Sequence, residues 1–134
     1  MGAAACRIAA AAHLLGACTS INAGAETFEG TRWQVAAING QPTPTTDVYR
    51  LSFDDGRIGA RFGCNSIGGI YRVERNMLVT GDLASTLMGC PEPAATHEAQ
   101  GSAVLGQPMR MHWASGSRIT LSNAAGSIEL ERLP

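Results

Sequence analysis

Lysine is absent from this chain, and its ten basic residues are all arginines. These arginines and the eleven acidic residues are scattered along the sequence, and the formal net charge is −1 at pH 7. Proteins that bind nucleic acid through its phosphates need a clustered basic surface. The sequence therefore predicts no nucleic-acid partner.

Charged and aromatic residues are also scarce, at 16% and 5% of the chain. No apolar run is long enough to cross a bilayer as a permanent helix, which takes about 20 residues. The hydrophobic share of 45% is nonetheless that of a globular protein. A length of 134 residues suits one ordinary domain, so we expect a single folded domain with one core.

The N-terminus has the features of an export signal. Arg7 supplies a positive charge, and the short apolar run after it ends in Leu15-Gly16-Ala17-Cys18. A leucine and two small residues before a cysteine resemble the bacterial lipobox, in which the cysteine is diacylated and becomes the mature N-terminus. We expect a lipoprotein signal peptide at residues 1–17, lipidation of Cys18 and a tether at residues 18–30.

The residue after this cysteine bears on where the protein is located. Thr19 stands in place of the aspartate that is associated with retention in the inner membrane. We therefore expect an outer-membrane lipoprotein that faces the periplasm and has the membrane as a partner through its lipid anchor. The alternative is an ordinary secretory signal cleaved after Ala23 or Ala25. Cys18 would then be discarded, and the protein would be soluble in the periplasm or secreted.

Four cysteines are present, but two of them belong to the signal region. Cys6 leaves with the signal peptide, and Cys18 is either lipidated or removed, so Cys64 and Cys90 remain. Two cysteines in an exported domain most often form a disulfide. In the chain-entropy account, a bridge that closes a loop of this length stabilises the fold by roughly 3 to 4 kcal/mol.

Two other uses of these cysteines stay open. A metal ion could recruit Cys64 and Cys90 together with His97 and His112, although no two of the four have the spacing of a ligand pair. A catalytic thiol would need a base and a nearby positive charge, and the nearest charge is Arg61. No other residues match a hydrolase motif. We expect no enzyme, no cofactor and no catalytic residue, and a periplasmic metal-handling protein is the alternative function.

Apolar residues alternate with polar ones in short runs that end at turn residues, as in half-buried strands. The runs are 31–37, 49–53, 58–62, 67–73, 77–80, 109–113, 119–121 and 128–130. Gly68 and Gly69 favour a bulge, and residues 94–105 are the helical candidate. The pattern predicts an α+β, mainly β fold: about eight short antiparallel strands curled into a small barrel or sandwich, with one short helix.

Two cysteine-bearing segments carry a resemblance to a known family. Their residues are Gly63, Cys64, Asn65, Gly69 and Tyr71 in the first, and Thr86, Met88, Cys90 and Glu98 in the second. Together they resemble the signature of the META domain family, which includes the bacterial heat-shock protein HslJ. The resemblance covers essentially the chain from residue 30 onward, and we assign residues 31–134 to a META/HslJ-like domain.

The resemblance implies a fold of antiparallel strands with one helix, frequent lipoprotein signals and a loose association with envelope stress. It implies no enzymatic activity. Gly101 stands where a bulky residue of the helix is usual, so we expect a less well packed helix. The expected function is a non-enzymatic envelope lipoprotein that serves stress tolerance or outer-membrane maintenance. Its partner would be an envelope protein, or an apolar ligand held at the mouth of the sheet.

Overall fold

The computed structural model describes residues 27–134, so the predicted signal peptide and Cys18 lie outside the described residues. The described elements, in chain order, are β1 (Thr31–Ile38), β2 (Gln41–Pro42), β3 (Tyr49–Asp54), β4 (Arg57–Phe62), β5 (Ser66–Glu74), β6 (Met77–Ser85), α2 (Ala94–Leu105), β7 (Met109–Ser115), β8 (Arg118–Asn123) and β9 (Gly126–Arg132). Within this part of the chain, no helix combines the length and the apolar character that a bilayer crossing requires.

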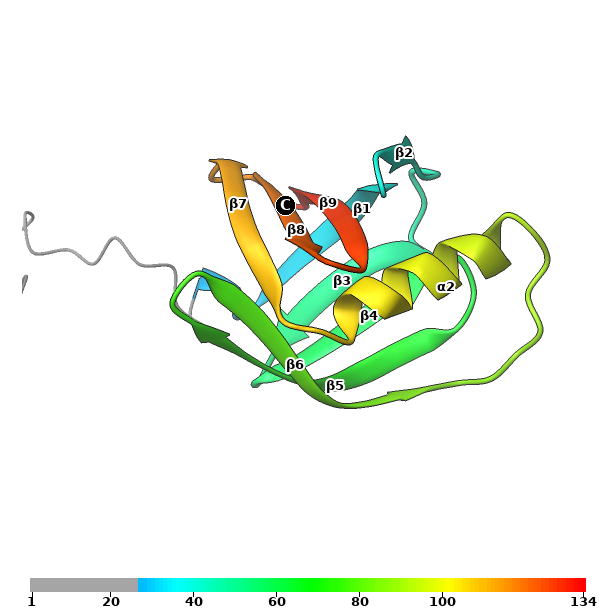
Figure 1. Cartoon of the computed structure of the whole chain (residues 1–134), viewed down its shortest axis with the longest axis horizontal. Coiled ribbons are helices and arrows are strands. Elements are labelled where there is room, and N and C mark those ends of the chain that lie inside the picture. Colours follow the sequence, from blue (N-terminus) through cyan, green and yellow to red (C-terminus); the bar gives the residue numbers. More distant parts are fainter. Residues whose placement is uncertain (1–26) are drawn as a thin grey trace, which may run out of the picture.

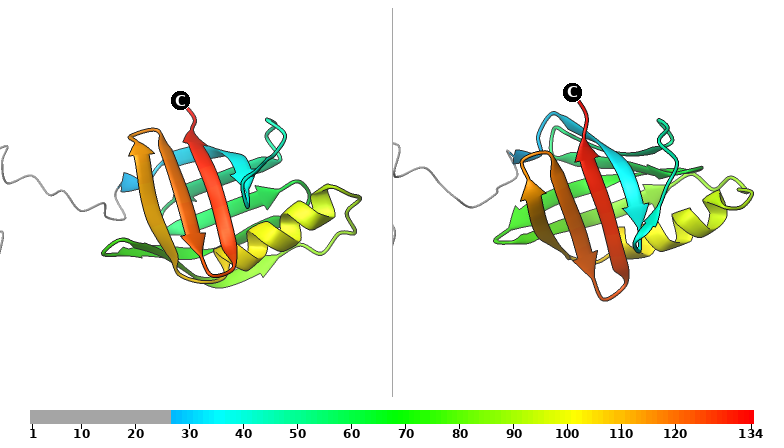
Figure 2. Two further views of the ribbon diagram at one scale, coloured as in Figure 1. Left: turned by 45° about the horizontal axis from the view of Figure 1, so that its top comes forward. Right: turned by 90° about the horizontal axis from the view of Figure 1, so that it is seen from above.

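Eight of these strands close into an antiparallel barrel (Figures 1 and 2). Consecutive strands pair from β3 through to β9, and β1 pairs with β3. The barrel closes because β9 also pairs with β1. The two-residue strand β2 adds only to the end of β1. The predicted mainly β fold with one short helix is confirmed, and closure selects the barrel over the sandwich.

The tight turns follow from residues that tolerate a positive φ. Asn39 and Gly40 have φ of 52° and 80° between β1 and β2, and Asp55 and Gly56 have φ of 53° and 73° between β3 and β4. Two consecutive positive φ values suit the twist of a β-hairpin, and Asn-Gly and Asp-Gly adopt them at low cost. The Asp-Gly pair therefore joins β3 and β4 in a tight hairpin, with Tyr49 opposite Phe62.

The predicted bulge at the glycine pair is also present. The register between β5 and β6 shifts between Gly68 and Ile70. A Cβ atom on Gly69 would lie 2.5 Å from the carbonyl oxygen of Gly81, so only glycine lets the two strands approach this closely.

One end of the barrel is closed by an aromatic cluster around Phe28. The Phe28 side chain is fully buried, with ring centroids 4.7 Å from Phe53 and 5.8 Å from Trp113. Trp33 and Tyr71 complete the cluster. Residues 28–30, which the sequence analysis assigned to the tether, therefore belong to the folded domain.

The opposite end of the barrel is closed by α2, whose buried face consists of Gly101, Val104 and Leu105 (Figure 2). A Cβ atom on Gly101 would lie 2.6 Å from the ring of Phe62. The expectation that this glycine loosens the helix was wrong, because the missing side chain is what lets α2 lie directly on Phe62. The close contact offsets the helix propensity that glycine lacks, about 1 kcal/mol relative to alanine.

Both ends of the barrel are thus filled by the protein's own side chains. An apolar ligand at either mouth would have to displace Phe28 or α2.

The segment before β1 is attached to the β3–β4 turn through Glu29. Its carboxylate accepts hydrogen bonds from the backbone N–H groups of Asp55 at 2.8 Å and Gly56 at 3.0 Å, and from the hydroxyl of Tyr71. These bonds favour the charged carboxylate, so they lower the pKa of Glu29, with the Tyr71 hydroxyl as the largest cause. Glu29 therefore anchors the start of the domain beside Phe28.

Acid should weaken this anchor. Because the pKa of Glu29 is lower in the folded than in the unfolded protein, its contribution is present above the unfolded pKa and is lost as the pH falls through the folded one. We expect Glu29→Gln to be less stable than the wild type at neutral pH, with a difference that narrows below about pH 4. Urea unfolding at a series of pH values measures this difference, and Glu129→Gln on β9 is the control. A pH-independent difference would contradict the proposed role of the carboxylate.

Candidate functional site

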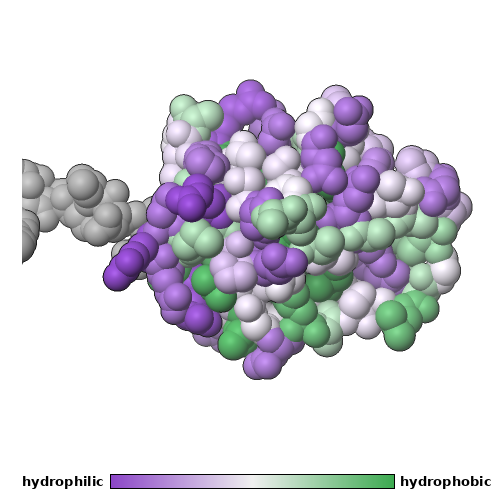
Figure 3. All heavy atoms as spheres, viewed as in Figure 1, coloured by the Kyte–Doolittle hydropathy of each residue, from purple (hydrophilic) through white to green (hydrophobic). Residues whose placement is uncertain are grey.

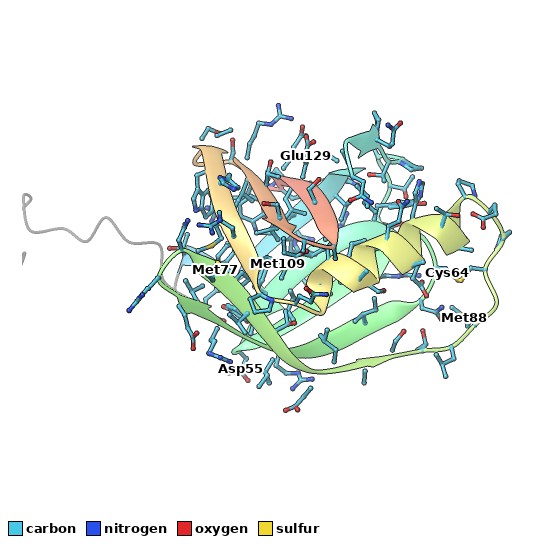
Figure 4. The ribbon with its side chains drawn as sticks, in the orientation of Figure 1. Asp55, Cys64, Met77, Met88, Met109 and Glu129 are labelled. Carbon is cyan, nitrogen blue, oxygen red and sulfur yellow. A yellow bond between two sulfur atoms is a disulfide. The ribbon has the colours of Figure 1, made fainter. Side chains whose placement is uncertain are left out.

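Most residues of the predicted family motif gather at the α2 end of the barrel. Cys64 and Asn65 lie in the turn from β4 to β5, Thr86, Met88 and Cys90 in the connection between β6 and α2, and Glu98 on α2. Figure 4 shows Cys64 beside the start of α2 and Met88 on this connection. We call these six residues the motif cluster.

A disulfide joins Cys64 to Cys90, with an S–S distance of 1.96 Å and a Cα–Cα distance of 6.1 Å. It ties the β4–β5 turn to the end of the β6–α2 connection across 26 residues of sequence. For a loop of this length, the bond contributes roughly 3.5 kcal/mol in the chain-entropy account.

The side-chain amide of Asn65 is the centre of the motif cluster, and the residue is only 3% exposed. Its Oδ1 accepts hydrogen bonds from the backbone N–H of Met88 at 2.7 Å and from the Thr86 hydroxyl at 2.8 Å. Its Nδ2 donates to Glu98 Oε2 at 2.8 Å and to the Met88 carbonyl at 3.2 Å. Two acceptor positions and two donors are the full capacity of an amide. Asn65 therefore has no group left for a ligand.

Glu98 completes the link between the turn and the helix. Its Oε1 accepts the backbone N–H of Asn65 at 2.7 Å, while Oε2 accepts the amide of the same residue. The neighbouring His97 has a different partner, since its Nδ1 is hydrogen-bonded to the Tyr49 hydroxyl at 2.6 Å. Burial raises the pKa of Tyr49, so this phenol stays protonated. The two adjacent titratable residues therefore act in separate contacts.

The remaining motif residues shape the backbone or lie elsewhere. Gly63 has φ of 109°, a backbone conformation that other residues rarely adopt. A Cβ atom there would also lie 2.6 Å from the Tyr49 hydroxyl oxygen, so this position requires glycine. Gly69 forms the bulge between β5 and β6. Tyr71 lies at the other end of the barrel, where it bonds to Glu29. The motif thus contributes to both ends of the fold.

The metal ligands considered from the sequence are not brought together as a set. Among residues 27–134, a candidate group consists of Cys64, Cys90 and Glu98, whose ligand atoms lie within 4.8 Å of one another. Neither His97 nor His112 belongs to this group. Metal binding requires thiolates, whereas both sulfurs are in the disulfide.

The β6–α2 connection also carries two exposed apolar side chains, one of them that of Met88 in the motif cluster. Leu87 is 93% exposed and Met88 is 57% exposed. Figure 3 shows hydrophobic atoms at the surface at this end of the molecule. Both backbone groups of Met88 are bonded to Asn65, so the connection presents these side chains from a fixed backbone.

Replacing the central amide by an isosteric carboxylate tests this arrangement. In Asn65→Asp, a second carboxylate would face Glu98 Oε2 and the Met88 carbonyl in place of a donor. We expect a loss of about 2 kcal/mol or more in the free energy of unfolding at neutral pH, because buried acceptors are left without a donor. The loss should shrink in acid, where a protonated carboxyl donates again.

Urea unfolding at neutral and acid pH measures this effect. Asn76→Asp, in the exposed β5–β6 turn, is a matched control with the same change of charge. Equal stability of Asn65→Asp and the wild type at neutral pH would refute the central role of the amide.

Comparisons with known proteins agree with this architecture. The sequence profile of the META domain matches residues 26–132. An NMR structure of a protein has a TM-score of 0.69 at 21% identity, and the alignment covers 80% of this chain and 92% of that one. An NMR structure of a protein from Burkholderia xenovorans has a TM-score of 0.65 at 17% identity, with coverages of 81% and 86%. Sequence identities this low support a common fold and nothing more. A search of curated proteins finds no match.

The META domain profile matches most of the length of this chain, so the chain belongs to the META domain family.

Proposed function

We propose that this chain is a non-enzymatic lipoprotein of the bacterial envelope whose META domain binds an envelope protein. The binding surface is the β6–α2 connection, with Leu87 and Met88 as its apolar contacts. The observation that carries the proposal is the exposure of these two side chains, 93% and 57%, on a backbone held in place by the motif cluster. Stress tolerance or outer-membrane maintenance is the proposed setting.

A fixed backbone favours a binding role for this segment. Association costs free energy wherever side chains and loops must become ordered. The Asn65 amide and the disulfide order the connection within the free protein. Leu87 and Met88 could therefore bury apolar area against a partner without first ordering the backbone, and the flexible thioether adapts to the partner's shape.

The contacts inside the domain favour binding over catalysis. The Asn65 amide uses all its donors and acceptors within the domain, and each oxygen of the Glu98 carboxylate accepts a hydrogen bond from Asn65. Catalysis needs a nucleophile and a base that converge on a space for substrate. Beside the cluster, α2 lies directly on the buried Phe62 ring, which occupies this end of the barrel interior.

The proposed anchor would place the binding surface away from the membrane. The described chain begins at the Phe28 end of the barrel, and the β6–α2 connection lies at the opposite end (Figure 1). A domain anchored through Cys18 at the outer membrane would thus direct Leu87 and Met88 toward the periplasm. A disulfide suits that oxidising compartment.

The alternative function is a periplasmic metal-handling protein that uses Cys64, Cys90 and Glu98. The separation of their ligand atoms, within 4.8 Å, favours it once the disulfide is reduced. Glu98 would then have to leave its hydrogen bonds with Asn65. Metal loading would therefore also release α2 from the β4–β5 turn.

Substitution of the proposed lipidation site tests the anchor. We expect Cys18→Ala to move the protein from the membrane fraction to the soluble periplasmic fraction, because the acyl chains are lost. The intact mass of the mature wild-type protein should show the lipid on Cys18 and no free thiol. An unchanged membrane fraction with an unchanged mass would refute lipidation, and free thiols that bind stoichiometric zinc would favour the metal-handling alternative.

Site-specific cross-linking in living cells tests the binding surface. A photoreactive residue at position 87 should give a discrete adduct with an envelope protein, and Met88→Ser should weaken it. The same residue at position 57, exposed at the Phe28 end of β4, is the control. Identical adducts at both positions, or none at position 87, would contradict the proposed surface.

A further inference from the structure

Two arginines lie opposite each other on the outer face of the barrel. Arg50 on β3 and Arg61 on β4 are direct partners in the antiparallel ladder, and both side chains are partly buried. Like charges at directly opposed positions destabilise a sheet. The ion pairs formed within residues 27–134 involve other arginines, on β5 and β8. Neither Arg50 nor Arg61 therefore forms an ion pair within the described part of the chain.

The arginine pair borders a surface hollow of about 230 Å³. The register explains the hollow: Ser52 lies opposite Gly59, and Arg61 lies opposite Ser66. Gly59 has no side chain, so the sheet is bare between the arginines and the neighbouring serine. The full lining is Asp47, Arg50, Ser52, Gly59, Ala60, Arg61, Ser66 and Ile67. We call this feature the arginine hollow.

The guanidinium groups carry donors that the protein leaves unused. The Nε atoms of Arg50 and Arg61 are both buried and have no hydrogen-bond partner. Arg61 has one contact, from its Nη2 to the Cys64 carbonyl at 3.3 Å. Buried donors are nearly always paired, and an unpaired one costs stability unless a ligand accepts it.

We propose that the arginine hollow binds a phosphate group, either free or in a lipid headgroup. Two permanent positive charges against the single carboxylate of Asp47 favour an anion. Guanidinium groups pair with oxyanions through strong, charge-assisted hydrogen bonds. Donors are available from both arginines and from the hydroxyls of Ser52 and Ser66, which lie on β3, β4 and β5, whereas the acceptor sites of a carboxylate lie in one plane. A tetrahedral oxyanion matches this set.

Titration of the full chain with inorganic phosphate tests the proposal directly. The Nε–H signals of Arg50 and Arg61 in NMR spectra should shift saturably at constant ionic strength, and phosphate should raise the melting temperature more than chloride does. Arg50→Gln should weaken binding by about tenfold. It should also raise the melting temperature without phosphate, because the like-charge pair is removed.

Two further variants make the result specific. Arg110→Gln, on the outer face of β7, makes the same change of charge away from the hollow and should leave phosphate binding unchanged. Gly59→Val keeps both arginines but fills the hollow, since even a Cβ atom there lies 3.0 Å from Ser52 Oγ. It should abolish binding. Absence of saturable shifts, or equal weakening in Arg110→Gln, would overturn the proposal.

Vesicles separate the two sources of phosphate. The Cys18→Ala chain is mixed with phosphatidylglycerol vesicles or with neutral phosphatidylcholine vesicles and sedimented. Sedimentation with the anionic vesicles that is lost in Arg50→Gln and kept in Arg110→Gln would assign the hollow to a lipid headgroup. Saturable phosphate binding without sedimentation would assign it to a soluble phosphate compound.

Discussion

The amide of Asn65 is the interaction on which the α2 end of this molecule depends. It joins the start of β5 to the backbone of Met88 and to Glu98 on α2, three segments that are distant in the sequence. The Cys64–Cys90 disulfide closes the same junction covalently. An amide can serve all three because it has both donors and acceptors, whereas a carboxylate would repel Glu98. The helix is thereby held over the barrel end that it fills.

Closure of both ends determines where this domain can act. Phe28 fills one end, and α2 lies on Phe62 at the other, at a distance that only Gly101 permits. Larger barrels hold ligands inside, but an eight-stranded barrel has an interior that side chains can fill. Specific binding by such a domain depends on what its outer face and loops expose. In this chain those features include an apolar pair of residues on a fixed connection and an arginine pair that forms no ion pair within the described residues.

Local patterns in the sequence predicted the local structure well. Alternation predicted the strands, Gly68 and Gly69 predicted the bulge, and residues 94–105 form α2 as predicted. Contacts between segments that are distant in the sequence had no corresponding pattern. The pairing of β1 with β9 joins the two ends of the domain, and hydrophobic periodicity carries no information about which strands meet. Phe28 and Glu29 precede the first alternating run, so their burial and anchoring depend on tertiary contacts alone.

The sequence pattern did not predict that Arg50 and Arg61 lie opposite each other, because their pairing is set by the register of two strands. The contact of Arg61 with the Cys64 carbonyl connects the arginine hollow to the disulfide turn. The same turn holds Asn65, which in turn fixes the β6–α2 connection. A ligand in the hollow would therefore contact a side chain that touches the motif cluster. Because the disulfide and the buried amide join these segments, the two proposed surfaces would keep one fixed orientation to each other and to the Phe28 end of the barrel.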